Sequence, residues 1–204
     1  MRLPPAFILL GFALLALTGC PGNAPTRLYV LTATTDKPAS TSPEGAAIGV
    51  GPITLPKYLD RPQIVTRVAA NSLDQANLDQ WGGDLNDNIT RVVATNLSNL
   101  LATDRVSLYP WKDGAPVDFQ VTMDISRFEQ DKDGNAVLNV FWSIVNKDGT
   151  MLLMRRSSYT QPAGEPASQS DNARPFDAQA AAMSRDLALL SHDIATAITG
   201  LKGS

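Results

Sequence analysis

Cysteine and histidine are nearly absent from this chain, which has one of each among its 204 residues. Because the single cysteine, Cys20, follows an apolar N-terminal run, the rest of the chain has no thiol for a disulfide, a zinc site or a nucleophile. His192 lies between Ser191 and Asp193 in a predicted helix, where adjacent side chains point to different faces and cannot form a catalytic triad. The sequence therefore gives no positive case for an enzyme, and we expect neither catalysis nor a metal or other cofactor.

A surplus of positive charge and a membrane-spanning helix are also missing. The chain has 17 Lys and Arg residues against 20 Asp and Glu residues and a net charge of −3, so nothing points to nucleic acid as a partner. The apolar run from Ala6 to Leu17 is too short for a helix that crosses a hydrocarbon core of about 30 Å. Residues 131–135 resemble the start of a calcium loop, but the glycine comes fourth instead of sixth, and we expect a hairpin there.

The first twenty residues have the layout of a bacterial lipoprotein signal. Arg2 supplies a positive start, the apolar run follows, and small residues come directly after it. The sequence Leu17-Thr18-Gly19-Cys20 resembles the lipobox, at which a peptidase cuts before a cysteine that carries a diacylglyceryl group. The alternative is an ordinary secretory signal with an accidental cysteine. Signal length, small residues and the cysteine together favour the lipobox.

Lipid attachment at Cys20 sets the predicted organisation of the chain. We predict a signal peptide at residues 1–19, which is removed, a lipidated tether at residues 20–26 and one folded domain at residues 27–204. Each buried CH₂ of an acyl chain contributes about 0.8 kcal/mol, so several chains hold a protein on a bilayer nearly permanently. The residue after Cys20 is Pro21 rather than the aspartate of the commonest inner-membrane retention signal. We therefore expect the protein on the periplasmic face of the outer membrane.

Hydrophobic periodicity and turn signals predict a single domain of the α+β class. Strands are expected at residues 27–32, 48–53, 63–68, 106–109, 117–126, 136–145 and 151–159. Asp-Gly pairs at residues 133–134 and 148–149 predict tight hairpins, so the last three strands form an antiparallel meander. The predicted architecture is a mixed, mostly antiparallel sheet with two long amphipathic helices packed on it.

Each of the two predicted helices carries one apolar stripe at spacings of three and four residues. The first is expected to start at Asp79 or Gln80 and to end near Thr103, with Trp81 opening the helix and lying in the core. The second runs from about Phe176 to Leu201. We expect its stripe to lie on the sheet, and the alternative is a coiled-coil surface for a partner.

The segment between the second and third predicted strands is unusually rich in proline and glycine. Pro52 and Pro56 should keep most of residues 52–57 out of a regular ladder. Such residues fix a particular loop shape, and rigid loops that present aromatic and apolar groups are where binding tends to occur. This favours an exposed loop that binds a partner.

A purely structural role for the same loop is equally compatible with these residues. In that interpretation Tyr58 and Leu59 cap the hydrophobic core. Asp60 then pairs with Arg61 or Arg67. Physical chemistry alone leaves the binding and the structural interpretations open.

Residues 48–67 resemble the signature of the ABC-type transport auxiliary lipoproteins, the paraquat-inducible protein C family. Further similarities follow in order along the chain, at Trp81, Ile89–Val92, Asn96-Leu97, Tyr109-Pro110-Trp111, Leu187–Ser191 and Asp193–Ala195. Together they extend from about Leu28 to Ile198. The sequence departs from the family pattern at Gly82-Gly83-Asp84, where stronger helix formers are expected, and this leaves the start of the first helix open.

The resemblance implies a non-enzymatic lipoprotein that accompanies MCE (mammalian cell entry) proteins, which carry lipids between the inner and outer membranes and support membrane integrity. The implied partners are an MCE-domain protein of the same transport system and the membrane, through the acyl chains on Cys20, and we also consider self-association. Our hypothesis for the partner or assembly surface comprises Leu55, Pro56, Tyr58, Leu59, Asp60, Arg61, Pro62 and Gln63. The alternative function is a stand-alone periplasmic lipoprotein that binds a lipid or small molecule in a pocket under the Pro-rich loop.

Overall fold

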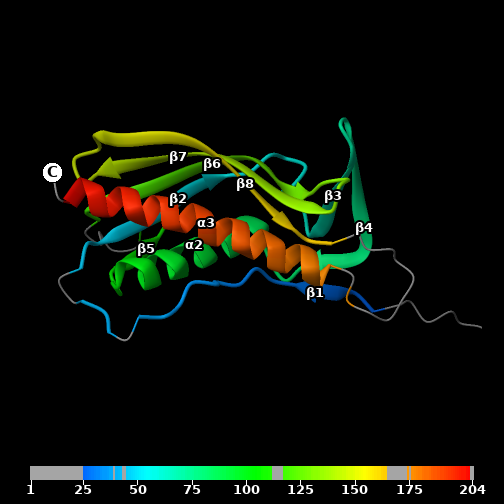
Figure 1. The fold of residues 1–204 in the computed structure, drawn as a ribbon, viewed down its shortest axis with the longest axis horizontal. Helices are drawn as coiled ribbons and strands as arrows, with labels where there is room; N and C mark the ends of the chain where they lie inside the picture. The colour runs from blue at the N-terminus through cyan, green and yellow to red at the C-terminus, as the bar shows by residue number, and fades with distance from the viewer. Residues whose placement is uncertain are drawn as a thin grey trace, which may run out of the picture.

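The computed structural model describes residues 25–38, 40–42, 45–111, 117–164, 174 and 176–202. This part of the chain folds into one α+β domain of eight strands and two helices. In chain order the elements are β1 (Arg27–Tyr29), β2 (Ile48–Thr54), β3 (Gln63–Ala69), β4 (Ser72–Trp81), α2 (Leu85–Leu101), β5 (Val106–Leu108), β6 (Phe119–Gln130), β7 (Asn135–Asn146), β8 (Met151–Pro162) and α3 (Asp177–Lys202). Figure 1 shows a curled sheet with both helices packed side by side against it.

The sheet is mixed, and its long pairings are antiparallel. Its strand order is β1-β4-β3-β6-β2-β5, and β7 lies between β6 and β8. The β6–β7 and β7–β8 pairs are antiparallel over almost their whole length, whereas the parallel pairs of β1 with β4 and of β2 with β5 are three residues long. The predicted meander with turns at Gly134 and Gly149, both at positive φ, is therefore confirmed.

The core lies between the sheet and the two helices. The apolar stripe of α3 faces this core and contacts β7, β8 and α2, so the prediction that it lies on the sheet is confirmed. The fully buried large side chains are Ile48, Ile64, Ile89, Leu97, Ile125, Phe128, Leu138, Trp142, Ile144, Met183, Leu187 and Leu190. They come from both helices and from four strands, which makes this one continuous core.

The first helix starts later than the sequence predicts. Residues 72–81 form the strand β4, and Trp81 is its last residue instead of the first residue of a helix. Gly83 has φ 137°, a conformation that side-chain-bearing residues rarely adopt, and Asp84 then caps the helix by accepting a hydrogen bond from the backbone N–H of Asp87. The expected core position of Trp81 is confirmed, since its side chain is 4% exposed.

Several strand boundaries also differ from the prediction. β6 continues to Gln130 instead of residue 126, and β8 continues to Pro162 instead of residue 159. β2 continues through Pro52 to Thr54, because the pairing with β6 skips Gly51 and Pro52 and resumes where Ile53 meets Met123. A local irregularity of this kind accommodates a proline that has no N–H to donate. The first strand ends at Tyr29, three residues earlier than expected.

The predicted signal peptide and the predicted lipid-attachment residue, Cys20, lie outside the described residues. Within the described ranges, no helix combines the length and the apolar character needed to cross a membrane.

Candidate functional site

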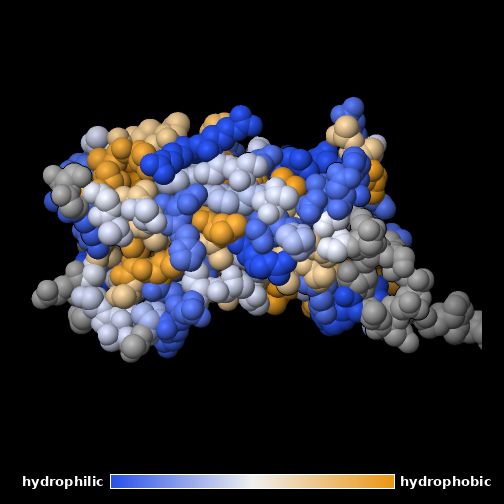
Figure 2. Space-filling model, in the orientation of Figure 1, coloured by the Kyte–Doolittle hydropathy of each residue, from blue (hydrophilic) through white to orange (hydrophobic). Residues whose placement is uncertain are grey.

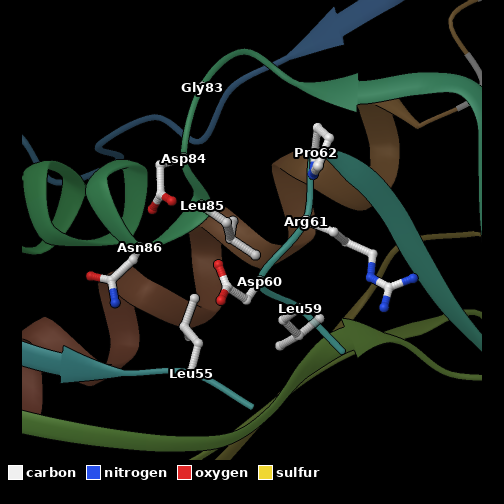
Figure 3. A pocket seen from close by; sticks show the side chains of 9 residues that line it. All are labelled: Leu55, Leu59, Asp60, Arg61, Pro62, Gly83, Asp84, Leu85 and Asn86. Carbon is white, nitrogen blue, oxygen red and sulfur yellow. The ribbon is translucent and has the colours of Figure 1, made fainter. Parts of the chain in front are cut away.

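The Pro-rich loop, residues 55–62, connects β2 to β3 and lies beside the N-terminus of α2. Between them is a hollow of about 280 Å³, whose lining is drawn in Figure 3: Leu55, Leu59, Asp60, Arg61, Pro62, Gly83, Asp84, Leu85 and Asn86. In this view the Asp60 carboxylate points toward Leu55 and Asn86, whereas Arg61 extends away from the hollow. The predicted surface residues are thus joined by a second segment, residues 83–86, that the sequence analysis did not include.

The loop is held in shape by its own backbone and by burial. The N–H of Leu59 donates to the carbonyl of Pro56 at 2.9 Å, and the N–H of Trp81 donates to the carbonyl of Pro62 at 2.7 Å. Leu59 is 3% exposed and belongs to the hydrophobic core, and Leu55 is partly buried against it. Leu59, and the partly buried Tyr58 beside it, therefore pack on the core as the structural interpretation expects.

A buried carboxylate, that of Glu129 on β6, anchors the aromatic residue of the loop. Its side chain has no solvent exposure. One oxygen accepts a hydrogen bond from the Tyr58 hydroxyl at 2.8 Å, and the other accepts from Nε of Arg67 at 2.8 Å and from Nε of Arg127 at 2.9 Å. The backbone N–H of Phe128 adds a bond of 3.1 Å to the first oxygen. Charge-assisted bonds of this kind compensate for the loss of water around a buried charge.

The protonation states reinforce this network. Burial raises the pKa of the Tyr58 phenol to about 12, and the negative charge of Glu129 acts in the same direction. The phenol therefore stays protonated at neutral pH and donates its hydrogen bond to the carboxylate. The hydrogen bond to Glu129 also raises the pKa of Arg67 above its ordinary value. Tyr58 is consequently positioned by the fold and is half-buried.

The predicted pairing of Asp60 with Arg61 or Arg67 is wrong. Arg67 donates its hydrogen bond to the carboxylate of Glu129, and the exposed Arg61 donates to the side-chain oxygen of Gln75 at 2.7 Å. Asp60 lies 3.6 Å from Nζ of Lys57 in an exposed ion pair, which contributes less than about 1 kcal/mol. No local sequence pattern marks Glu129, because two of its partners lie 62 and 71 residues away along the chain.

The exposed part of the loop consists of Lys57, Asp60, Arg61 and Pro62, which we call the rim. A second hollow of about 510 Å³ adjoins the first and shares Leu55, Asp60, Asp84 and Asn86 with it. It adds the carboxylate of Asp87, so one side of the combined groove is acidic. The arrangement can present fixed charges and a shallow groove to another molecule. Among the described residues, no group of three or more His, Cys, Asp or Glu side chains could hold a metal ion.

This eight-stranded α+β domain with its Pro-rich loop matches a known family over most of its length. Residues 29–195 match the family described as the ABC-type transport auxiliary lipoprotein component, and the chain belongs to this family. The description of this family names its members as lipoprotein components that are auxiliary to ABC-type transport. The family resemblance inferred from residues 48–67 is confirmed.

Two solved structures share the fold at low sequence identity, and a third structure is less similar. The crystal structure of an uncharacterized protein is 18% identical, with a TM-score of 0.66 over 86% of this chain and 99% of that chain. Protein XCC0632 from Xanthomonas campestris is 19% identical, with a TM-score of 0.62 over 86% of this chain and 98% of that chain. A PelC dodecamer from Paraburkholderia phytofirmans is 13% identical, with a TM-score of 0.40 over 76% of this chain and 92% of that chain. Among curated proteins, none matches this sequence.

Proposed function

We propose that this protein is the non-catalytic auxiliary lipoprotein of an MCE-type system that moves lipids between the inner and outer membranes. Acyl chains on Cys20 would anchor it to the periplasmic face of the outer membrane. Its partner would be the MCE-domain protein of the same system. Membership of the transport auxiliary family and the lipobox-like sequence at residues 17–20 support this proposal.

The observation that carries the proposal is the way the loop is built. Its inner side is fixed by Leu59 in the core and by Tyr58 on Glu129, while the rim remains exposed. A preorganised loop loses little conformational entropy when a partner binds, so more of the interaction energy appears as affinity. We therefore assign the docking surface for the MCE-domain protein to the rim and the adjoining groove.

The alternative, a stand-alone lipid- or small-molecule-binding lipoprotein, fits this geometry less well. The hollow of about 280 Å³ under the loop and the adjoining hollow of about 510 Å³ form an open groove, whereas small-molecule pockets enclose most of their ligand. Asp60 and Asp84 are among its lining residues, and carboxylates oppose the burial of an acyl chain. The groove suits a short polar or basic group of a partner protein better than a lipid tail.

The test is copurification of the full-length lipoprotein from its native membranes, with identification of bound proteins and lipids by mass spectrometry. Arg61→Ala removes a rim charge whose side chain is exposed, and Lys147→Ala, in the exposed β7–β8 turn, removes an equal charge elsewhere. We expect an MCE-domain protein to be recovered with the natural chain and with Lys147→Ala, and its recovery to fall at least fivefold with Arg61→Ala. Stoichiometric lipid without a protein partner would support the stand-alone carrier, and equal recovery with both variants would remove the rim from the docking surface.

A further inference from the structure

The strand β8 leaves one edge of the sheet without a partner strand. It pairs with β7 over residues 151–162, and no other described strand pairs with it. At about 3.3 Å per residue its twelve residues present nearly 40 Å of backbone. A long unpaired edge is a template for the addition of another strand. Among the described strands, the edges at β1 and β5 are only three residues long, and residues 72–78 of β4 form a shorter unpaired edge than β8 does.

Two adjacent arginines mark the middle of this edge. The guanidinium of Arg155 lies 5.9 Å from the centre of the Trp142 ring, and that of Arg156 lies 5.5 Å from the centre of the Phe141 ring. None of the ion pairs in the described part of the chain involves either arginine. Because neighbouring residues in a strand point to opposite faces, one guanidinium is available on each face of the sheet.

Apolar side chains precede the arginines at the start of β8. Met151, Leu152 and Met154 are exposed, Met154 to 60%. Beside Met154 is a hollow of about 490 Å³ on the face of the sheet away from the helices, lined among others by Pro52 and Phe141. Figure 2 shows the hydrophobic patch at the upper left of the molecule, next to a strongly hydrophilic stretch over β8. An apolar side chain of an added strand could fill this hollow.

We propose that β8 binds an extended segment of a partner protein, which joins the sheet as a ninth strand. The segment carries two adjacent acidic residues, one for Arg155 and one for Arg156, and an apolar residue for the hollow beside Met154. Directly opposed charges of opposite sign stabilise cross-strand pairs, whereas like charges destabilise them. β8 itself contains no Asp or Glu, so a second copy of β8 could not supply these acidic residues in any register. We therefore assign the edge to a different protein.

This docking edge is separate from the rim of the Pro-rich loop, and the inference does not depend on the identity of the transported molecule. It can be tested with a photo-reactive amino acid at Ser158, an exposed residue of β8, in the full-length lipoprotein in its native membranes. A matched probe at the exposed Thr95 of α2 reports non-specific crosslinking. Crosslinked peptides are identified by mass spectrometry in the natural chain, in Arg156→Glu and in Arg91→Glu, which reverses an exposed charge on α2.

We expect Ser158, and not Thr95, to crosslink to a segment with two adjacent acidic residues in one partner protein. Charge reversal at a desolvated pair weakens binding strongly, so the yield should fall about tenfold or more with Arg156→Glu and stay unchanged with Arg91→Glu. Changing an acidic residue of the captured segment to arginine should restore the yield with Arg156→Glu.

Crosslinks to lipid alone, to a second copy of this chain or to a segment without acidic residues would each overturn the proposal. An absent crosslink, or one that is insensitive to Arg156→Glu, would do the same. The crosslink is also measured in the Arg61→Ala variant. Binding at β8 and binding at the rim are thereby tested separately.

Discussion

Replacing Asp186 by asparagine is expected to make this protein more stable at pH 8. Asp186 lies on α3, its side chain is fully buried, and neither carboxylate oxygen has a hydrogen-bond partner among the described residues. Burial without compensating bonds raises the pKa of this carboxyl from 3.8 to about 7, against a smaller opposing effect of the Arg185 charge. The folded protein therefore holds the Asp186 proton more tightly than the unfolded chain does.

The sign and size of the effect follow from this difference in proton binding. The stability that Asp186 contributes is fully present below pH 3.8 and is lost as the pH rises through 7. At about 1.4 kcal/mol per pKa unit, the loss amounts to about 4 kcal/mol above pH 7. Asparagine carries no charge, but its amide would also be unpaired there, at a cost of about 1–3 kcal/mol. The net gain for Asp186→Asn at pH 8 is thus about 1–3 kcal/mol. At pH 4 the carboxyl of the folded protein is protonated while the amide cost remains, so the variant should be less stable than the natural chain by about 0.5–2.5 kcal/mol.

The assay is urea-induced unfolding of the full-length protein in detergent at pH 4, 5 and 8, followed by circular dichroism. Asp36→Asn, at an exposed carboxylate, is the control for the loss of one negative charge. The other titrating groups act equally in the natural chain and in both variants. Only the differences in the free energy of unfolding between these three proteins at each pH are therefore compared. A variant Asp186→Asn that is no more stable than the natural chain at pH 8, or whose advantage is the same at pH 4, would refute the assigned protonation.

Two further stability predictions concern the candidate site. Glu129→Gln leaves the guanidinium groups of Arg67 and Arg127 without their buried counter-charge, so we expect a loss of about 3 kcal/mol in urea unfolding; a loss below 1 kcal/mol would contradict the anchoring role of this residue. Gly83→Ala places a side chain at φ 137° next to the cap of α2 and should cost about 1–3 kcal/mol in the same assay. Ala at the exposed helical position Gly200, where an added Cβ would meet no other part of the fold within 4 Å, should instead leave stability unchanged or raise it.

The elements that the sequence predicted well are those whose pattern is local. The stripe of α3 and the alternation along β6 depend only on spacing within the element, and Asp-Gly pairs form tight turns wherever they separate two strands. β4 has no such pattern. In its pairing with β3, Gln63 lies opposite Gln80, but Val65, only two residues further, lies opposite Gln75. Five residues of β4 thus match two of β3, so residues 72–81 do not alternate regularly between buried and exposed positions. The loop that follows, with its two glycines, then ends the strand and delays the helix.

Asp79 illustrates why a correct residue type can suggest the wrong element. An acidic residue just before an apolar stripe is typical of a helix start, which is how the sequence favoured residues 79–80. In the fold Asp79 is buried in β4, where it accepts two hydrogen bonds from Arg27, at 2.6 and 2.8 Å, and one from the Tyr29 hydroxyl at 2.8 Å. These partners lie about fifty residues earlier in the chain. Only the pairing of β1 with β4 brings them together.

The same limitation changes which loop residues can carry the proposed docking. Tyr58 and Leu59 were grouped with Asp60 and Arg61 on sequence alone, because all four are consecutive in an unusual segment. Glu129 separates them: it holds Tyr58 on the inner side of the loop, and Leu59 is buried beside it. A substitution at Tyr58 therefore disturbs the support of the loop before it removes any contact with a partner. The exposed charges of Asp60 and Arg61 can instead be changed with little effect on the fold, so loss of binding at these two residues is the evidence that identifies a docking surface.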